Sequence, residues 1–441
     1  MSYDPLISSG VASNATQPDT YWRTTVDAPP HQTLNQDIST DVVVIGAGYT
    51  GLNAAWHLSQ QGVDCVLLDA SAPGFGCAGR NGGFVLSGTG RLGLPQLAER
   101  YSETVARGMQ CEFAEAVELV TARISDEHID CDLVSGPYYK LAYSGKHAHK
   151  LQQSVITLND SYGGNATYLD HTSLRKQLGV HRAFGASVQE GLALNPLKLS
   201  YGYLQSLRQA GCPVYHHSPV TSLTKQGSDY TLQTPAASIR ANRVLIASNA
   251  YSPRQLHDAV DNRQFPVQSS ILVTNPLSDA QAEVCGLTRP MTMMDTRMMK
   301  YYYRVLPDGR LLFGGRGEVA GKGHDSFQAK RRLYKALQRS FPALAGLGIA
   351  HFWSGWVSVS YDDLPRVRYD AQNKIGYAMG YCGSGVSFAA LAGKRLAQQV
   401  LGESIDRSLP IYADDLPRFP LPQFRRLALR GLYTWAAISK R

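Results

Sequence analysis

The sequence predicts an α/β protein in which a parallel sheet, assembled from distant segments, is interleaved with an α+β region that contains a mixed sheet. Three observations lead to this prediction. An apolar run at 41–46 is followed by a glycine-rich turn and a helical pattern. Two more apolar runs, 243–248 and 374–380, have the same buried-strand character far along the chain. Between these runs, helical and strand-like patterns alternate over long insertions.

The composition is that of a globular protein, with 441 residues of which 44% are hydrophobic and 18% are charged. No apolar run reaches the length of a membrane span, and the first residues lack the basic and apolar parts of a secretory signal. The seven cysteines include no C-x-x-C pair, which favours reduced thiols in a cytoplasmic protein. His147 and His149 have no third ligand at helical spacing, so no metal site is expected.

The positive charge is concentrated at the C-terminal end. The net charge is 43 − 35 = +8, and residues 418–441 contain six basic residues and no acid, so the rest of the chain carries 8 − 6 = +2. This nearly neutral body argues against a nucleic-acid-binding protein. The favoured interpretation of the tail is a basic helix that packs on the domain through Leu427, Leu429, Leu432 and Trp435. The alternative is contact with an acidic partner or an anionic membrane surface. The sequence leaves the oligomeric state open.

The first motif is a strand, a glycine turn, a helix and a second strand. Residues 41–46 (DVVVIG) predict a strand buried on both faces, 52–61 a helix, and 63–69 the next strand. In the turn GAGYTG, the first glycine permits a tight turn, the second lets the backbone approach a pyrophosphate, and the third allows close helix–strand packing. The helix N-terminus attracts the phosphates, and the acid at the end of the second strand can accept hydrogen bonds from ribose hydroxyls. The predicted dinucleotide contacts are Gly46, Gly48, Tyr49, Thr50, Gly51, Asp69 and Ala70.

Two further glycine-rich loops favour FAD over NAD. The loop 74–83 (GFGCAGRNGG) directly follows the acidic strand end, where an extended FAD needs a second enclosing loop, and Arg80 could neutralise phosphate charge there. The loop 380–386 (GYCGSGV) lies between a predicted strand and a predicted helix at 387–401, and its N–H groups would face the flavin ring edge. The predicted contacts are Gly79, Arg80, Asn81, Gly82, Gly83, Gly383, Ser384, Gly385 and Val386.

These motifs resemble those of the FAD-dependent D-amino-acid-oxidase superfamily, and most of all those of the gamma-glutamylputrescine oxidoreductases within it. The resemblance includes YW at 21–22, NAY at 249–251, YYR at 302–304, RLLFGG at 310–315 and LAGK at 391–394. It implies a Rossmann-type FAD domain, a mixed-sheet substrate domain, oxidation of a carbon–nitrogen bond, and contact between Val220 and the adenine.

The third loop departs from the pattern of these relatives. Where they commonly read GYSGHGV, this chain has Cys382 and Ser384, which removes a histidine beside the flavin. Cys382 or Cys77 could form a thioether to the flavin, but a small buried thiol is the favoured interpretation.

The predicted domains interleave along the chain. Helical patterns at 95–127 and strand patterns at 265–273 and 301–315 are assigned to the substrate domain. The predicted boundaries are 1–36 for an N-terminal arm; 37–96, 190–254 and 352–404 for the FAD-binding domain; 97–189 and 255–351 for the substrate domain; and 405–441 for the basic tail.

The substrate prediction depends on an absent arginine. Amino-acid oxidases that resemble this chain hold the substrate carboxylate with an arginine just after the strand that corresponds to 353–360, whereas here the next arginine is Arg366. The sequence therefore favours an aliphatic amine whose carboxylate is absent or remote, as in a gamma-glutamyl polyamine. No general base is assigned, because the flavin mainly requires an aligned neutral amine. The candidate pocket residues are Tyr302, Tyr303, Trp353, Trp356 and Tyr361.

Three alternatives remain at this point. One is an amino-acid oxidase or dehydrogenase with Arg304 or Arg366 as the carboxylate clamp. Another is a flavoprotein subunit that passes electrons to a partner, and the least favoured is a non-catalytic FAD-binding protein. The electron acceptor is open, because Leu312 stands where sarcosine-oxidase relatives carry an oxygen-activating lysine; Lys300 and Arg316 are the candidate substitutes.

Overall fold

The computed structural model describes residues 3–180, 182–323 and 325–438. Its first sheet has the strand order β16–β17–β10–β1–β2–β7, with β8 and β9 attached beside β10. The predicted parallel core is confirmed, since β1 pairs in parallel with β10 and β2, and β10 pairs in parallel with β17. The strands are β1 (Ile38–Ile45), β2 (Cys65–Leu68), β7 (Val214–Tyr215), β8 (Ser222–Gln226), β9 (Asp229–Gln233), β10 (Ser238–Ile246), β16 (Arg366–Asp370) and β17 (Ile375–Met379).

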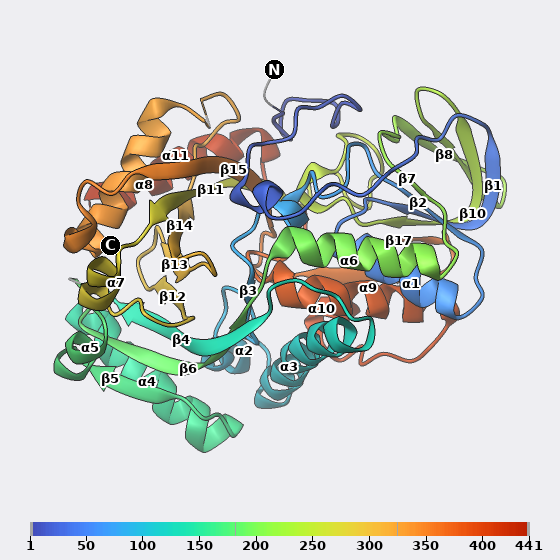
Figure 1. Ribbon diagram of the computed structural model, residues 1–441. Helices are drawn as coiled ribbons and strands as arrows, with labels where there is room; N and C mark the ends of the chain where they lie inside the picture. The colour runs from blue at the N-terminus through green and yellow to red at the C-terminus, as the bar shows by residue number, and fades with distance from the viewer. Residues whose placement is uncertain (1–2, 181, 324, 439–441) are drawn as a thin grey trace.

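Helices cover this sheet and bury its apolar face (Figure 1). Helix α1 (Tyr49–Gln60) packs closely on α9 (Gly385–Leu401), because a Cβ at Gly393 would lie only 2.4 Å from the carbonyl oxygen of Thr50. Outside them, α3 (Glu103–Asp126) stacks Phe113 on Phe388, with ring centroids 4.5 Å apart. The other helices on this side are α2 (Leu94–Arg100), α6 (Pro196–Gln209) and α10 (Pro410–Ala413).

The second sheet is mixed, as predicted, and has the order β15–β11–β14–β13–β12–β4–β6–β3, with β5 beside β6. One face packs a core of Tyr139, Met293, Tyr303, Phe313 and Phe341. Its strands are β3 (Phe84–Val85), β4 (Val134–Ala142), β5 (Thr167–Asp170), β6 (Gly185–Ala193), β11 (Phe265–Pro276), β12 (Thr292–Asp295), β13 (Tyr302–Val305), β14 (Arg310–Arg316) and β15 (Ile349–Val359). Its helices are α4 (Gly145–Tyr162), α5 (His171–Gln177), α7 (Asp279–Cys285) and α8 (Phe327–Ser340).

Two elements pack with a different domain from the one that their predicted residue ranges indicate. Helix α3 falls in the range assigned to the substrate domain, yet its buried side chains join the core over the first sheet. Most of strand β15 lies in the range 352–404, which the sequence predicts for the FAD domain. In the structure this strand pairs along its length with β11 of the second sheet. Sequence patterns give the type of an element but not the sheet or layer that it joins, which long-range packing decides.

Both ends of the described chain pack on the body. Near the start, a short 3-10 helix (Tyr21–Thr24) buries Trp22, so the predicted arm is folded onto the protein. Near the end, α11 (Arg425–Ile438) buries Leu429 against Phe265 and Val359. The other short 3-10 helices are Cys77–Gly79, Asn249–Tyr251, Pro342–Leu344 and Pro422–Phe424.

The tail helix packs on the body through only one of the four predicted residues. Of the four that were predicted, only Leu429 is buried, whereas Leu427, Leu432 and Trp435 are 59%, 41% and 47% exposed. The helix is anchored instead by Leu429, Ala436 and the partly buried Tyr433. Among the described residues, no helix has the length and apolar character that crossing a bilayer requires.

Candidate active site

A cavity of about 940 Å³ is lined by residues of both sheets, and the GAGYTG turn forms one part of its wall. Gly46 has φ +109°, which favours glycine, and a Cβ there would lie 2.9 Å from the backbone of Ala247. At Gly48 a Cβ would meet nothing within 4 Å, so this backbone is open to a ligand. Helix α1 begins here without a side-chain cap, which leaves its first N–H groups available to a phosphate.

Asp69 directly follows β2 (Cys65–Leu68) and lies beside this turn. Its Oδ2 accepts a hydrogen bond from the Ala47 N–H (2.7 Å), and its Oδ1 accepts one from the Ser71 N–H (3.0 Å). Burial raises the pKa of this carboxyl, although the two N–H donors oppose the shift. Among the described residues that line the cavity, Asp69 is the only acid. It lies where the second strand of a dinucleotide fold meets the ribose.

The second loop is held by two tryptophans. The Trp22 indole donates to the carbonyl of Asn81 (2.9 Å), and the Trp353 indole donates to the carbonyl of Arg80 (2.8 Å). The Asn81 side chain closes the loop from inside, because it donates to the carbonyls of Cys77 and Ala78. The YW pair of the arm therefore helps to position the second glycine-rich loop.

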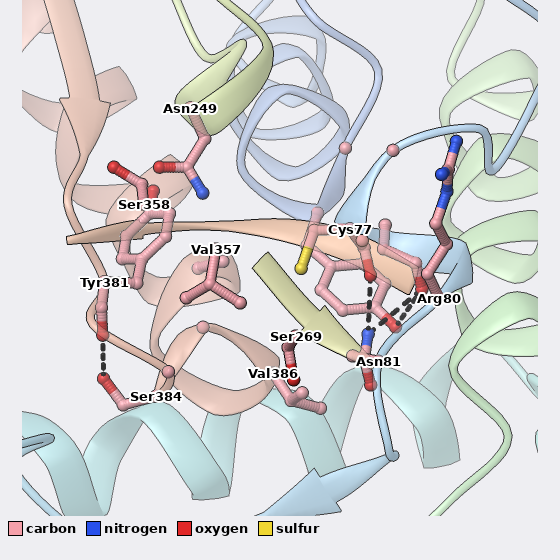
Figure 2. A pocket seen from close by; sticks show the side chains of 18 of the residues that line it. Cys77, Arg80, Asn81, Asn249, Ser269, Val357, Ser358, Tyr381, Ser384 and Val386 are labelled. Atoms are coloured by element: carbon pink, nitrogen blue, oxygen red, sulfur yellow. Dashed lines mark hydrogen bonds between the residues drawn. The ribbon is translucent and has the colours of Figure 1, made fainter. Parts of the chain in front are cut away.

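Arg80 lines the cavity and also holds the second loop in place, and its predicted contact with the phosphates stays a prediction. Its guanidinium donates to the carbonyls of Phe75 (2.6 Å) and Ser354 (3.3 Å) and lies 4.4 Å from the centre of the Phe75 ring. Figure 2 shows it turned away from Val357 and Val386, which face the cavity. Arg80 thus ties the second loop to β15.

The third loop joins the first through two hydroxyl groups, since Thr50 Oγ1 and Tyr381 Oη lie 2.6 Å apart. Gly383 has φ +103°, which allows the loop to turn before α9. Burial raises the pKa of both thiols at this site, that of Cys77 to about 11, and that of Cys382 in the same direction. Both side chains are partly buried and line the cavity, and the raised pKa values favour the thiol over the thiolate from which a thioether forms.

The predicted cofactor residues fall into two groups. Three glycines lie behind the cavity wall, because a Cβ would meet a carbonyl oxygen at 1.9 Å for Gly51, 2.1 Å for Gly79 and 2.0 Å for Gly83. They permit close packing, and direct FAD contact by them stays a prediction. The residues that line the cavity are Gly46, Gly48, Tyr49, Thr50, Asp69, Ala70, Arg80, Asn81, Gly82, Val220, Gly383, Ser384, Gly385 and Val386.

Sequence reasoning missed part of the wall. Arm residues 9–13 line the cavity together with Val220 and Pro253. Nothing in this polar, turn-rich segment could have indicated it. Asn249 and Tyr251 also line the cavity, and the NAY motif was the only available indication.

Tyr302 is the one predicted pocket aromatic that lines the cavity. Its hydroxyl lies 2.9 Å from Ser269 Oγ, and burial raises its pKa to about 12. The ring lies over Gly314, where a Cβ would come within 2.2 Å of it. A neutral phenol is therefore held on the cavity face of the sheet.

The other four predicted pocket residues do not line the cavity. Tyr303 points to the opposite face of β13 and stacks on Phe313, because side chains alternate along a strand. Trp353 is occupied in holding the second loop, and the Trp356 indole donates to the carbonyl of Tyr3 (3.3 Å). Tyr361 lies beyond the strand and is 56% exposed. On β15, the cavity is lined instead by Gly355, Val357 and Ser358.

Neither predicted carboxylate clamp reaches the cavity. Arg304 donates to the carbonyl of Leu194 (2.7 Å) and lies 5.2 Å from the Trp22 ring, and burial lowers its pKa to about 10. Arg366 is buried in an ion pair with Asp362 (2.6 Å). Both arginines serve the packing of the protein.

Four other cationic side chains line the end of the cavity formed by the second sheet: Arg91, Lys140, Lys300 and Arg316. Lys300 lies near the other three, and burial together with their positive charge lowers its pKa to about 8. Leu312 is buried and does not line the cavity. Lys300 and Arg316, the two residues named as candidates to replace the oxygen-activating lysine, do line it.

Comparison with known proteins agrees with this geometry. Residues 41–399 match the family model described as "DAO: FAD dependent oxidoreductase". The chain is 31% identical over 400 residues to gamma-glutamylputrescine oxidoreductase of Escherichia coli (strain K12), covering 90% of this chain and 91% of that one. It is 22% identical to glycine oxidase of Bacillus subtilis (strain 168), covering 83% and 94%.

Among solved structures, glycine oxidase from Geobacillus kaustophilus has the same fold, with a TM-score of 0.73 and 18% identity over 87% of this chain and 99% of that one. The three glycine-rich loops, the open N-terminus of α1 and the long cavity fit an extended FAD. The chain belongs to the DAO family of FAD-dependent oxidoreductases.

Proposed function

We propose that this enzyme oxidises the carbon–nitrogen bond of an aliphatic amine of the gamma-glutamyl polyamine type. The observation that supports it is the composition of the cavity wall along β15. Gly355 and Val357 offer no charge there, and neither Arg304 nor Arg366 lines the cavity. An α-carboxylate beside them would lose its hydration without gaining a partner from this strand, which costs several kcal/mol.

The reaction removes a hydride from carbon and a proton from nitrogen. The amine R–CH₂–NH₂ becomes the imine R–CH=NH, and water then gives the aldehyde R–CHO and ammonia. Bound FAD supplies the hydride acceptor, and its electrons pass to oxygen or to another acceptor. The protein excludes water and orients the amine, with Tyr302 and Val357 on the cavity wall.

The amine must react in its neutral form. Lys300 and Arg316 line the same space, and their charge disfavours an ammonium group. They favour loss of the substrate's extra proton before hydride transfer, and no carboxylate of the protein is needed as a base at this end.

An anaerobic panel tests the proposal. Purified holoenzyme is mixed without oxygen with aliphatic amines and with D- and L-α-amino acids, and flavin absorbance is followed. Bleaching by amines supports the proposal. Bleaching only by α-amino acids, or by no compound in the panel, overturns it.

Amino-acid oxidation is the second candidate, and one observation favours it. Arg316 lines the cavity on a strand two places from β15, so it could replace Arg304 and Arg366 as a carboxylate partner. Substitution Arg316→Gln would then abolish bleaching by α-amino acids. Peroxide formation by the single purified chain would separate both candidates from a subunit that passes electrons to a partner protein.

A further inference from the structure

The cationic cluster Arg91, Lys140, Lys300 and Arg316 faces the cavity without enough negative charge to balance it. No acidic side chain of the described chain forms an ion pair with Lys140, Lys300 or Arg316, and Arg91 alone has a partner, Asp363 (3.1 Å). The nearby Asp295 is held by Arg297 at 2.5 Å. Cations in such a position are stabilised by an anion from outside the chain.

The cluster lies on the cavity face of the second sheet, away from the predicted pyrophosphate position. Lys140 pairs in register with Met294, and Met294 pairs with Tyr302 on the next strand, so these three side chains share one face. The pyrophosphate is expected at the N-terminus of α1, which belongs to the first sheet. An anion bound by this cluster would therefore belong to the substrate and not to the pyrophosphate.

The distance from β15 indicates which part of the substrate carries the anion. The strand order places Lys140 on β4, five strands from β15. At about 4.8 Å per strand Lys140 is about 24 Å from β15 along the sheet, whereas Arg316, on β14 two strands away, is about 10 Å from it. Lys300 and the long lysine side chains shorten the gap, but an anion among them still lies several bonds from a carbon that reacts near Val357.

We propose that Lys140, Lys300, Arg316 and Arg91 form a subsite for an anionic group, such as a carboxylate, at the far end of the amine substrate. This rests on the proposed amine oxidation and makes the substrate class narrower: an amine whose reacting carbon and anionic group are separated by an aliphatic spacer. The Lys140 side chain is open to the cavity that it lines, and the surrounding protein lowers its pKa.

Three probes with the same six-carbon skeleton test this subsite. 6-Aminohexanoate has a remote carboxylate, 6-aminohexanamide has a neutral amide in its place, and 2-aminohexanoate has the carboxylate beside the amine. Holoenzyme is mixed with each under anaerobic conditions, and the apparent dissociation constant and limiting rate of flavin reduction are measured. We expect 6-aminohexanoate to bind about tenfold or more tightly than the amide, the scale of one charge-assisted pair.

Substitutions assign the effect to the cluster. Lys140→Met and Lys300→Met should each reduce the preference for 6-aminohexanoate over the amide, measured as the ratio of their apparent dissociation constants. The control Lys176→Met removes an exposed lysine of α5 that does not line the cavity, and should leave the preference intact. Equal binding of acid and amide by the unmodified enzyme, or faster reduction by 2-aminohexanoate, overturns the subsite.

A binding measurement separates this inference from the proposed reaction. Glutarate has no amine to oxidise, so its stabilisation of the holoenzyme against heat reports anion binding alone. If glutarate raises Tm in the unmodified enzyme but not in Lys140→Met, the subsite stands even where no amine reduces the flavin. If amines reduce the flavin but glutarate and the acid–amide pair show no selectivity, only the subsite fails.

A second inference concerns the outer face of α11. At 3.6 residues per turn, Leu427, Leu432 and Ile438 lie within about 140° of one another around the helix and are 59%, 41% and 77% exposed, and Phe424, in the 3-10 helix just before it, is 51% exposed. Leu421, just before the helix, is exposed as well. Single exposed apolar residues are ordinary, but a continuous apolar stripe marks an interaction surface.

Charge complementarity indicates what covers this stripe. Residues 418–441 contain six basic residues and no acid, and Arg418 and Arg430 are exposed. A second copy of the chain would bring like charges together, whereas an anionic bilayer surface offers both apolar contact and negative charge. We propose that α11 lies in the interface of an anionic membrane, with its stripe in the lipid and its buried side on the protein.

Vesicle flotation tests this surface with the complete holoenzyme. We expect binding to phosphatidylglycerol vesicles, little binding to phosphatidylcholine vesicles, and a steep decrease with salt. The double substitution Leu427→Gln/Leu432→Gln should abolish binding, while Ile156→Gln, an exposed apolar residue of α4, should not. Undiminished binding by the double variant, absence of binding by the unmodified protein, or a dimer that the double variant dissociates would overturn the proposal.

Discussion

The hydroxyl groups of Thr50 and Tyr381 lie 2.6 Å apart in the protein interior, although 331 residues separate them in the chain. One belongs to the first turn of α1 and the other to the third glycine-rich loop. This bond fixes the two ends of the FAD-binding region to each other. The loops on which the cofactor depends are therefore stabilised as one unit rather than separately.

Removal of either hydroxyl should destabilise this unit. Tyr381→Phe leaves the Thr50 hydroxyl buried without this partner, which should cost about 1–3 kcal/mol in the free energy of unfolding. Thr50→Val should cost a similar amount, and the double variant should cost less than the sum of the two. Denaturant unfolding of the four proteins measures the coupling. Additive losses would mean that the two groups do not interact.

Asp69→Ala should weaken FAD retention. Loss of its hydrogen bonds to ribose hydroxyls should cost about 1–3 kcal/mol, and the N–H groups of Ala47 and Ser71 would also lose their acceptor. Fluorescence titration of the apoprotein with FAD gives the dissociation constant. Asp64→Ala, at an exposed position just before β2, is the matched control. A colourless protein that ignores FAD and binds NADH would contradict the assignment of the cofactor.

Gly314→Ala should move Tyr302 without altering a polar group. The new Cβ would come within 2.2 Å of the tyrosine ring, so the ring must shift and its hydroxyl must leave Ser269. Forced overpacking of this kind typically costs about 1–3 kcal/mol. We expect lower stability and a changed KM for amines with FAD retained. Gly145→Ala adds a methyl group in open space and should change neither quantity.

An arginine at Val357 should admit α-amino acids. Val359 ends the same strand and Tyr361 lies just beyond it, but neither lines the cavity, whereas Val357 does. In the unmodified enzyme, amines should exceed the matching α-amino acids by about a hundredfold in kcat/KM, or about 2.7 kcal/mol. Val357→Arg should narrow this difference by offering a carboxylate partner. Faster oxidation of α-amino acids by the unmodified enzyme would instead indicate that Arg316 binds their carboxylate.

Glutarate binding should weaken as the pH rises through about 8. The pKa of Lys300 is lowered to about 8 by burial and by the charges of Lys140, Arg91 and Arg316, and it is raised in part by Asp295. Below this pH Lys300 is an ammonium group and binds the anion; above it, the charge is lost, and affinity should fall by up to about tenfold per pH unit. Calorimetry from pH 6.5 to 9.5 measures this, and Lys300→Met should give a flatter profile.

The cofactor loops could be predicted from the sequence because their requirements are local. A turn at Gly46 needs a positive φ, a helix must begin directly after Gly48, and an acid must end the next strand at Asp69. Each condition is met within about thirty residues, so neighbouring residue types reveal it. The parallel order of distant strands was also accessible, because buried strands have a recognisable apolar composition.

The substrate end of the cavity was decided by tertiary structure alone. Tyr302 and Tyr303 are adjacent and chemically identical, yet strand pairing turns one to the cavity and buries the other against Phe313. Lys140 and Lys300 come from segments that no local pattern connects, and the sheet order brings them to one wall. Face and neighbourhood depend on register and on strand order, which are set by the packing of the whole core and not by the residues that flank each position.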